Sequence, residues 1–159
     1  CGYYPDRKKC TCSQGQIKNY LGRISKPLLD RIDIFTETII LKYGEISNSD
    51  KGENSYDVRK RIEKVHHIQK ERYKNDGILF NSELSAGMIK RYCVMDNEAK
   101  EYLENIFENM EFSARAYHKV LKTARTIADM DESGEIKRKH ISEAVCYRTA
   151  DKKYWGVIM

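Results

Sequence analysis

Apolar residues recur every three or four positions through most of the chain after residue 55, which is the spacing of amphipathic helices. The segment 113–129 is the clearest example. Ser113 is a good N-cap for it, because a serine hydroxyl can accept a backbone N–H of the first turn that has no helical partner. Its charged residues fall on the side opposite the apolar stripe. The stripe consists of Ala116, Val120, Ala124, Ile127 and Ala128.

Four further segments have the same pattern, so we predict a five-helix domain over residues 55–150. Ser55, Ser85 and Asp96 can each cap the first turn of one of these helices, and the last helix is expected to begin near Lys137. About 95 residues are enough to enclose a hydrophobic core. In the first, third and last of these helices, the residues expected to point inward are Val58, Ile62, Val65, Leu103, Ile106, Ile141, Ala144 and Val145.

The first 45 residues have a different pattern, and we interpret them as a short remnant of an α/β domain. A helix is expected over 16–25, with Pro27 at its end or at the start of the next turn. The segment 34–41 is rich in β-branched residues and predicts a strand, but the sequence offers no clear partner strand for it. The fold class is therefore mainly α. Residues 46–54 are expected to form a linker, and residues 151–159 a tail that includes the strand-like run 155–158.

The composition is that of a globular domain. Charged residues make up 33% and hydrophobic residues 40%, and no apolar run approaches the roughly 20 residues of a membrane span. Lys and Arg outnumber Asp and Glu by 29 to 24, a modest excess that permits contact with phosphate without indicating a dedicated nucleic-acid surface. The chain begins with Cys1 and has no signal-peptide pattern, so we expect an excised piece of a cytoplasmic protein.

Three of the five cysteines lie close together near the start of the chain. Cys1, Cys10 and Cys12 can supply metal thiolates, but three ligands make an incomplete structural zinc site. The alternative is a loop with incidental thiols. The odd number of cysteines argues against a secreted disulfide scaffold and favours a reducing cytosol. We expect Cys93 and Cys146, which stand alone in helical patterns, to be small core residues.

Arg115 falls in the first turn of the helix expected at 113–129, where a cation is mildly unfavourable because the helix N-terminus already carries partial positive charge. The same arrangement suits a bound phosphate, which would meet both unpaired N–H groups and the guanidinium. From the residues alone, Arg115 either awaits an anion or is an ordinary surface residue. The four histidines have no spacing typical of a metal or catalytic site, and no P-loop motif is present.

Short motifs run along nearly the whole chain. They are Cys1-Gly-Tyr-Tyr-Pro-Asp6, Cys10-Thr-Cys12, Tyr20-Leu-Gly-Arg-Ile-Ser25, Pro27-Leu-Leu-Asp-Arg-Ile-Asp33, Asn81-x-Glu-Leu-Ser85, the segment 113–129 and Glu143-Ala-Val-Cys-Tyr-Arg148. In this order they resemble the magnesium-chelatase-like AAA+ ATPases of the YifB/ComM type. The resemblance implies the C-terminal portion of such a protein: the last helix and strand of the ATPase core, followed by the helical lid. The segments that grip nucleotide would precede Cys1, so the chain alone is not expected to hydrolyse ATP.

The resemblance also implies roles for two arginines. Arg31 matches the arginine finger, which reaches the γ-phosphate of nucleotide in a neighbouring subunit. Arg115 matches the second sensor arginine, which reaches nucleotide in its own subunit. Both roles suit a planar guanidinium, which stabilises charge on a transferred phosphoryl group. The alternative for Arg31 is an ion pair with Asp30 or Asp33, and we interpret Arg125 as a structural residue.

The parent protein implied by the resemblance is a homo-oligomeric ring that uses ATP and Mg²⁺ and acts on DNA, in branch migration, recombination or competence. One alternative is the ATPase subunit of a magnesium chelatase, and another is a non-catalytic helical interaction module. In the family, a four-cysteine element begins with a Cys-Pro-Cys pair. Cys1 would be the second cysteine of that pair, so the missing ligand of the zinc site would lie just upstream.

Overall fold

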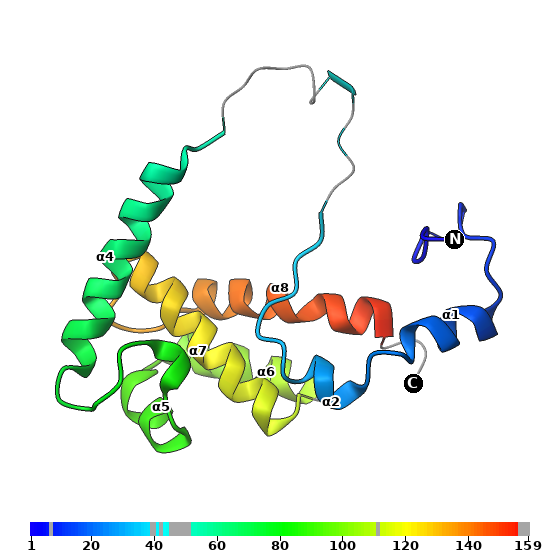
Figure 1. The fold of residues 1–159 in the computed structure, drawn as a ribbon. Coiled ribbons are helices and arrows are strands. Elements are labelled where there is room, and N and C mark those ends of the chain that lie inside the picture. The colour runs from blue at the N-terminus through cyan, green and yellow to red at the C-terminus, as the bar shows by residue number, and fades with distance from the viewer. Residues whose placement is uncertain (7, 39–40, 42, 45–51, 111, 156–159) are drawn as a thin grey trace. The chain divides into compact units, whose positions relative to one another are not determined.

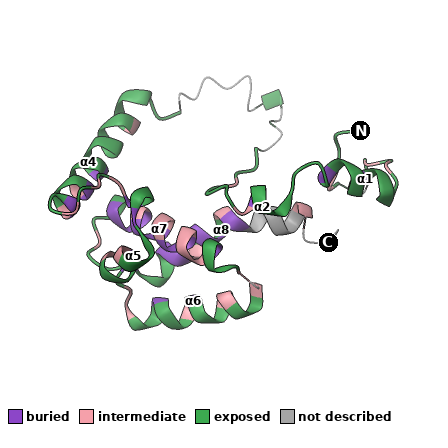
Figure 2. Cartoon of the chain, turned by 60° about the horizontal axis from the view of Figure 1, so that its bottom comes forward, coloured by how far each residue is buried: buried purple, intermediate pink, exposed green. Residues whose placement is uncertain are grey.

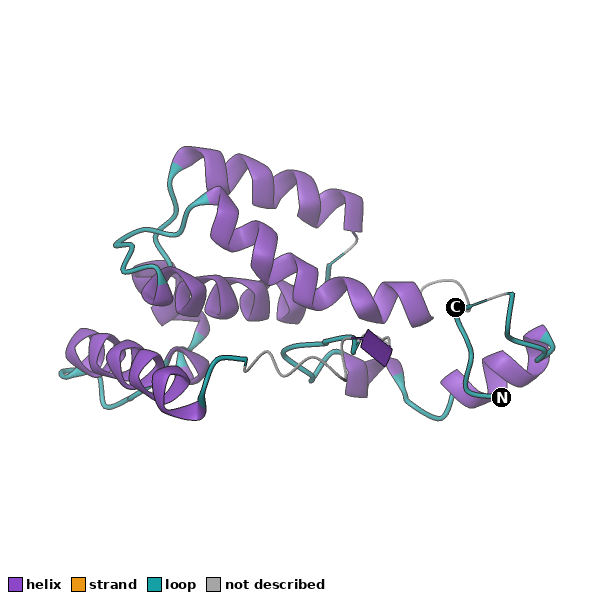
Figure 3. Ribbon diagram, turned by 90° about the horizontal axis from the view of Figure 1, so that it is seen from above, coloured by secondary structure: helices purple, strands orange, loops and turns teal. Residues whose placement is uncertain are grey.

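The structure, a computed structural model, describes residues 1–6, 8–38, 41, 43–44, 52–110 and 112–155. Within these ranges the chain forms α-helices and one 3-10 helix and has no strand, as Figures 1 and 3 show. This confirms the expected mainly α fold. The described residues fall into two compact units. The first contains the chain up to Thr36 and again from Cys146, and the second contains the residues between them.

All five helices expected after residue 55 are present. Ser85 and Ser113 are N-caps as predicted. The first of the five helices is capped one residue earlier than expected, because the Asn54 side chain accepts the backbone N–H groups of Tyr56 and Asp57, both at 3.0 Å. The elements are α4 (Ser55–Tyr73), η1 (Asn81–Glu83), α5 (Ala86–Tyr92), α6 (Asn97–Met110), α7 (Ala114–Met130) and α8 (Arg138–Trp155).

α7 is the central helix of the second unit. α4, η1 and α5 all pack against it, and Figure 2 shows buried residues along much of its length. Fully burying a Val, Leu or Ile side chain stabilises a fold by roughly 1.5–3 kcal/mol, so Val120, Leu121 and Ile127 are the main contributors on this helix. Its buried apolar residues are Ala116, Val120, Leu121, Ala124, Ile127 and Ala128.

The first half of α4 differs from the prediction. Val65 and Tyr73 are buried, but Ile62 is 41% exposed and Val58 is only half-buried. The expectation that Ile62 points into the core is therefore wrong. Helical spacing tells which side of a helix faces the core, whereas the length of helix that the core covers depends on where the partner elements lie.

α7 ends where the sequence predicted. Glu132 adopts a left-handed conformation with φ 52°, and the N–H of Ser133 donates to the carbonyl of Ala128 at 2.8 Å. The chain then forms an isolated parallel bridge between Ile136 and Met95. Because Ile136 is fully buried, this bridge ties the connection between α5 and α6 to the start of α8.

The first unit contains α1 (Gln14–Leu21), α2 (Lys26–Leu29) and the later part of α8. The strand expected over 34–41 is wrong for its described residues, which join no strand ladder; residues 39 and 40 lie outside the described ranges. Instead, the N–H of Phe35 donates to the carbonyl of Tyr147 at 2.9 Å, so this segment packs on α8.

α8 also runs further than expected. It reaches Trp155, whose Nε1 donates to the carbonyl of Leu21 at 3.1 Å. Position 155 is therefore helical rather than strand-like, and residues 156–159 lie outside the described ranges. In the part of the chain that the structure describes, none of the helices has the length and apolar character needed to cross a bilayer.

Candidate functional site

Arg115 lies in the first turn of α7, as the sequence predicted. The hydroxyl of Ser113 accepts the N–H of Ala116 at 3.1 Å and so caps the helix. The Arg115 side chain is exposed, and among the described residues it makes no hydrogen bond or ion pair. Its guanidinium is thus available to an anion at the positive end of the helix.

Arg31 lies two residues after the end of the short helix α2, which has Pro27 in its first turn. Its backbone N–H donates to the carbonyl of Leu28 at 3.0 Å, and its Nη1 donates to the carbonyl of Pro27 at 3.3 Å. The Arg31 side chain is exposed. Arg31 belongs to the first unit and Arg115 to the second.

The three N-terminal cysteines come together. The Sγ atom of Cys1 lies 3.6 Å from that of Cys10 and 3.3 Å from that of Cys12, and all three sulfurs lie within 4.8 Å of one another. Thiolates around a tetrahedral zinc ion, each about 2.3 Å from the metal, lie roughly 3.8 Å apart. The donor set therefore fits zinc in chemistry and spacing. Within the described residues, the group holds three ligands.

The other two cysteines behave differently from each other. Cys93 is buried, as predicted, and burial raises the pKa of its thiol to about 11. Cys146 is exposed, so the expectation that it is a core residue is wrong. It lies on α8 next to the buried Val145, where one step along the helix turns a side chain away from the core.

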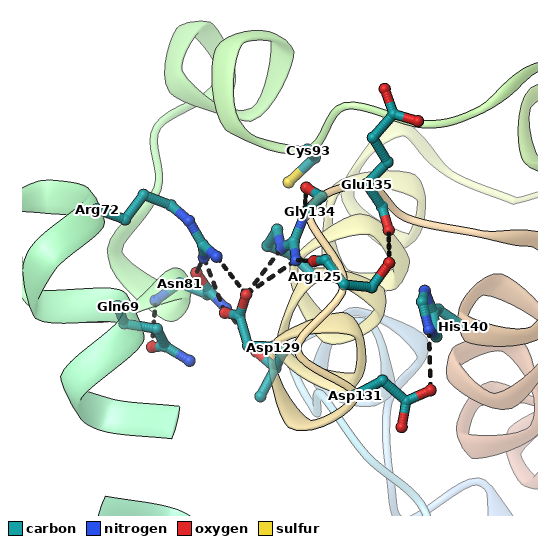
Figure 4. A network of polar contacts seen from close by, with 12 residues as sticks. Gln69, Arg72, Asn81, Cys93, Arg125, Asp129, Asp131, Gly134, Glu135 and His140 are labelled. Carbon is teal, nitrogen blue, oxygen red and sulfur yellow. Dashed lines mark hydrogen bonds and ion pairs between the residues drawn. The ribbon is translucent and has the colours of Figure 1, made fainter. Parts of the chain in front are cut away.

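A buried carboxylate joins three elements of the second unit (Figure 4). Oδ2 of Asp129, on α7, accepts hydrogen bonds from Arg72 Nη1 at 2.8 Å and from Asn81 Nδ2 at 2.9 Å. Oδ1 of Asp129 accepts from Arg125 Nε at 3.0 Å and from the second terminal nitrogen of Arg72. Burial works to lower the pKa of Arg72, but the hydrogen bonds and charge of Asp129 outweigh it, so the pKa is raised. We call these four residues the Asp129 network.

Arg125 is structural, as predicted. It is 1% exposed, and besides Asp129 it binds the carbonyl of Gly134 at 2.8 Å. His140 is also satisfied within the fold. Its Nδ1 accepts the N–H of Lys137 at 2.9 Å, so the ring proton lies on Nε2, which faces Asp131 at 3.2 Å. Both side chains are 1% exposed and make these contacts within the fold, which favours a structural role for each.

Most of the buried polar residues could not be identified from the sequence pattern. Nothing in the local pattern singled out Arg72 or Asp129 for burial. Asn81 and Arg148 stand inside motifs that carried the family resemblance, yet those motifs alone assigned them no partner. Arg148 is 2% exposed and lies in the first unit.

Comparison with known proteins identifies the class to which this fold and these residues belong. Residues 52–148 match the family model "Magnesium chelatase, subunit ChlI C-terminal", and residues 1–46 match the model "Magnesium chelatase, subunit ChlI". The chain therefore belongs to the magnesium chelatase subunit ChlI family, which confirms the resemblance.

Individual relatives are similar along most of the chain. Competence protein ComM of Haemophilus influenzae is 38% identical over 148 residues, which is 92% of this chain and 28% of ComM. The uncharacterized protein YifB of Salmonella typhimurium is 37% identical over 142 residues, which is 89% of this chain and 27% of YifB. The chain thus spans little more than a quarter of the length of these relatives.

Proposed function

We propose that this chain is the nucleotide-sensing C-terminal part of a ring-forming, cytoplasmic AAA+ ATPase. In this proposal Arg115 contacts a phosphate of ATP–Mg²⁺ bound in its own subunit. Arg31 reaches the γ-phosphate of nucleotide bound by a neighbouring copy. The observation that carries the proposal is the position of Arg115, an exposed cation at a helix N-terminus. A bound phosphate would turn this unfavourable placement into a charge-assisted contact.

The test of Arg115 uses the complete protein, in which this proposal places a P-loop segment upstream of the chain. Arg115→Ala should lower the rate of ATP hydrolysis by roughly a hundredfold, the usual effect of removing one transition-state donor. The loss should persist in mixtures with other variants, because the arginine acts within its own subunit. Arg59→Ala, which removes an exposed arginine from α4, should leave the rate unchanged. An unchanged rate for Arg115→Ala would refute the sensor role.

The test of Arg31 depends on mixing subunits. Arg31→Ala rings should be inactive, because loss of a transition-state arginine costs roughly a thousandfold or more. Mixing them with subunits that have a defective Walker B segment but an intact Arg31 should restore part of the activity. If the mixture assembles and stays inactive, Arg31 does not act across the subunit boundary.

For the substrate we propose DNA. The name of ComM connects that relative with competence, and the excess of five cationic residues here permits contact with phosphates. The family description favours a second candidate, the ATPase subunit of a magnesium chelatase. ATP hydrolysis by the complete protein should rise on adding DNA if the first is correct. A rate of ATP hydrolysis that does not change with DNA but rises on adding a chelatase partner subunit would favour the second candidate.

We also propose that the three-cysteine cluster holds structural zinc together with a fourth ligand. The support is the spacing of the three sulfurs. Zinc would cross-link Cys1, Cys10 and Cys12, and the described residues up to position 12 have little secondary structure of their own.

A further inference from the structure

Arg148 is a charged residue that is almost completely buried. Its Nη1 donates to the main-chain oxygen of Ile32, and its Nη2 lies 4.0 Å from Oδ1 of Asp30. Its guanidinium carbon lies 5.5 Å from the centre of the Phe35 ring. A buried guanidinium is costly unless specific partners compensate for lost water. These contacts therefore hold α8 and the segment 30–35 in one arrangement.

Two of the groups that Arg148 holds are the chain neighbours of Arg31. Asp30 precedes it and Ile32 follows it, while the Arg31 side chain itself is exposed. Restraining the residues on both sides of Arg31 restrains the direction in which its side chain leaves the backbone. The hydrogen bond from Phe35 to Tyr147 adds a second attachment next to Arg148.

Local hydrogen bonds also restrain this segment, since the Arg31 N–H donates to the carbonyl of Leu28 and Nη1 donates to that of Pro27, but its secondary structure is short. α2 is only four residues long, and the described residues after Arg31 join no strand ladder. An arginine that must reach a phosphate on another subunit needs an accurate starting position, because a displacement of about 1 Å can cost roughly a hundredfold in rate. Arg148 lies 117 positions further along the chain, and its contacts can fix the starting position of Arg31.

We propose that Arg148 is a positioning residue for Arg31. It holds residues 30–32 in the orientation from which the Arg31 guanidinium reaches nucleotide bound by a neighbouring copy, and it contacts neither nucleotide nor reacting atoms itself. This inference rests on the proposed trans role of Arg31. It adds that the last helix of the chain, through Arg148, sets the efficiency of the neighbouring subunit's active site.

The experiment uses the complete protein with Arg148→Met, which keeps an unbranched apolar stem and removes the guanidinium with its charge. We expect kcat to fall by roughly a hundredfold with little change in KM for ATP, because nucleotide binding in the same subunit is untouched. Mixing with the Walker B variant should restore activity, as for Arg31→Ala. The double variant Arg31→Ala with Arg148→Met should be no slower than Arg31→Ala alone. Both changes remove the same contribution, which is that of the Arg31 guanidinium.

A matched control is Arg125→Met, which removes another buried arginine from the second unit. It should not be rescued by the Walker B variant, because its effect stays in its own subunit. If Arg31→Ala is rescued but an assembled Arg148→Met ring is not, the inference about Arg148 is wrong while the role of Arg31 stands. If Arg31→Ala itself is not rescued, the proposed function fails first. If Arg148→Met does not assemble, Asp30→Asn provides the test. A loss of ATP hydrolysis that the Walker B variant rescues would support the inference. An unchanged rate of ATP hydrolysis would overturn it.

Discussion

Arg125 and Asp129, one turn apart on α7, form a buried ion pair in which Nε lies 3.0 Å from Oδ1 and each residue is 1% exposed. The same carboxylate also holds Arg72 from α4 and Asn81 from η1. The pair therefore joins separate elements of the unit that carries Arg115. Its role is to fix how these elements pack.

The Asp129 network predicts a large loss of stability when its centre is removed. Asp129→Ala leaves Arg72 and Arg125 without their shared anion, and breaking a buried ion pair costs roughly 3–5 kcal/mol. Urea unfolding followed by circular dichroism measures this free energy. Glu98→Ala removes an exposed pair with Arg138 and should cost at most about 1 kcal/mol. Equal losses for the two variants would contradict a structural network.

The burial pattern predicts a large loss of stability on truncating one isoleucine and a small loss on truncating another. Ile141 is fully buried, so Ile141→Ala should lower the free energy of unfolding by roughly 2–5 kcal/mol through lost burial and the cavity left behind. Ile62→Ala makes the same chemical change at an exposed position of α4 and should cost about 0.5 kcal/mol or less. Thermal or urea unfolding measures both. A large loss for Ile62→Ala would show that the first half of α4 is covered in solution.

The Cys93 thiol predicts a loss of stability in alkali. Its pKa is raised to about 11 in the folded chain from an unfolded value near 9.0. Between these values the unfolded chain has lost the proton and the folded chain retains it, so rising pH favours unfolding. Stability should fall from about pH 9 to about pH 11, and Cys93→Ala should remove this part of the decline.

Unfolding curves at several pH values measure the alkaline effect. Thiol modification gives an independent check, because the exposed Cys146 should react quickly with a disulfide reagent at pH 8 while Cys93 reacts only as the fold opens. Rapid reaction of Cys93 in the folded protein would contradict its burial.

The three-cysteine cluster predicts metal content. The complete protein, purified under reducing conditions, should contain about one zinc ion per chain, and Cys10→Ser should lower that content because it removes one thiolate. Cys146→Ser is the matched control and should leave zinc unchanged. Elemental analysis measures the ratio. A wild-type protein without zinc would refute the site.

The helices after residue 55 could be predicted from sequence because their determinants are local. The apolar stripe of α7 and the caps at Ser85 and Ser113 involve residues at most a few positions apart. The placement of Arg115 at a helix start followed from the same local pattern. Its role in sensing nucleotide was inferred from the family resemblance that the order of motifs indicates, and it stays a prediction.

Tertiary packing decided the rest, because it depends on residues far apart in the chain. The segment 34–38 has strand-like composition, but it packs on α8 rather than in a sheet. Ile62 and Val65 fit the same helical stripe, and only the extent of the core separates the exposed residue from the buried one. Asp129 meets Arg72 across 57 positions, and Arg148 meets Ile32 across 116. No local pattern encodes such pairs, since each requires two elements to arrive at one place.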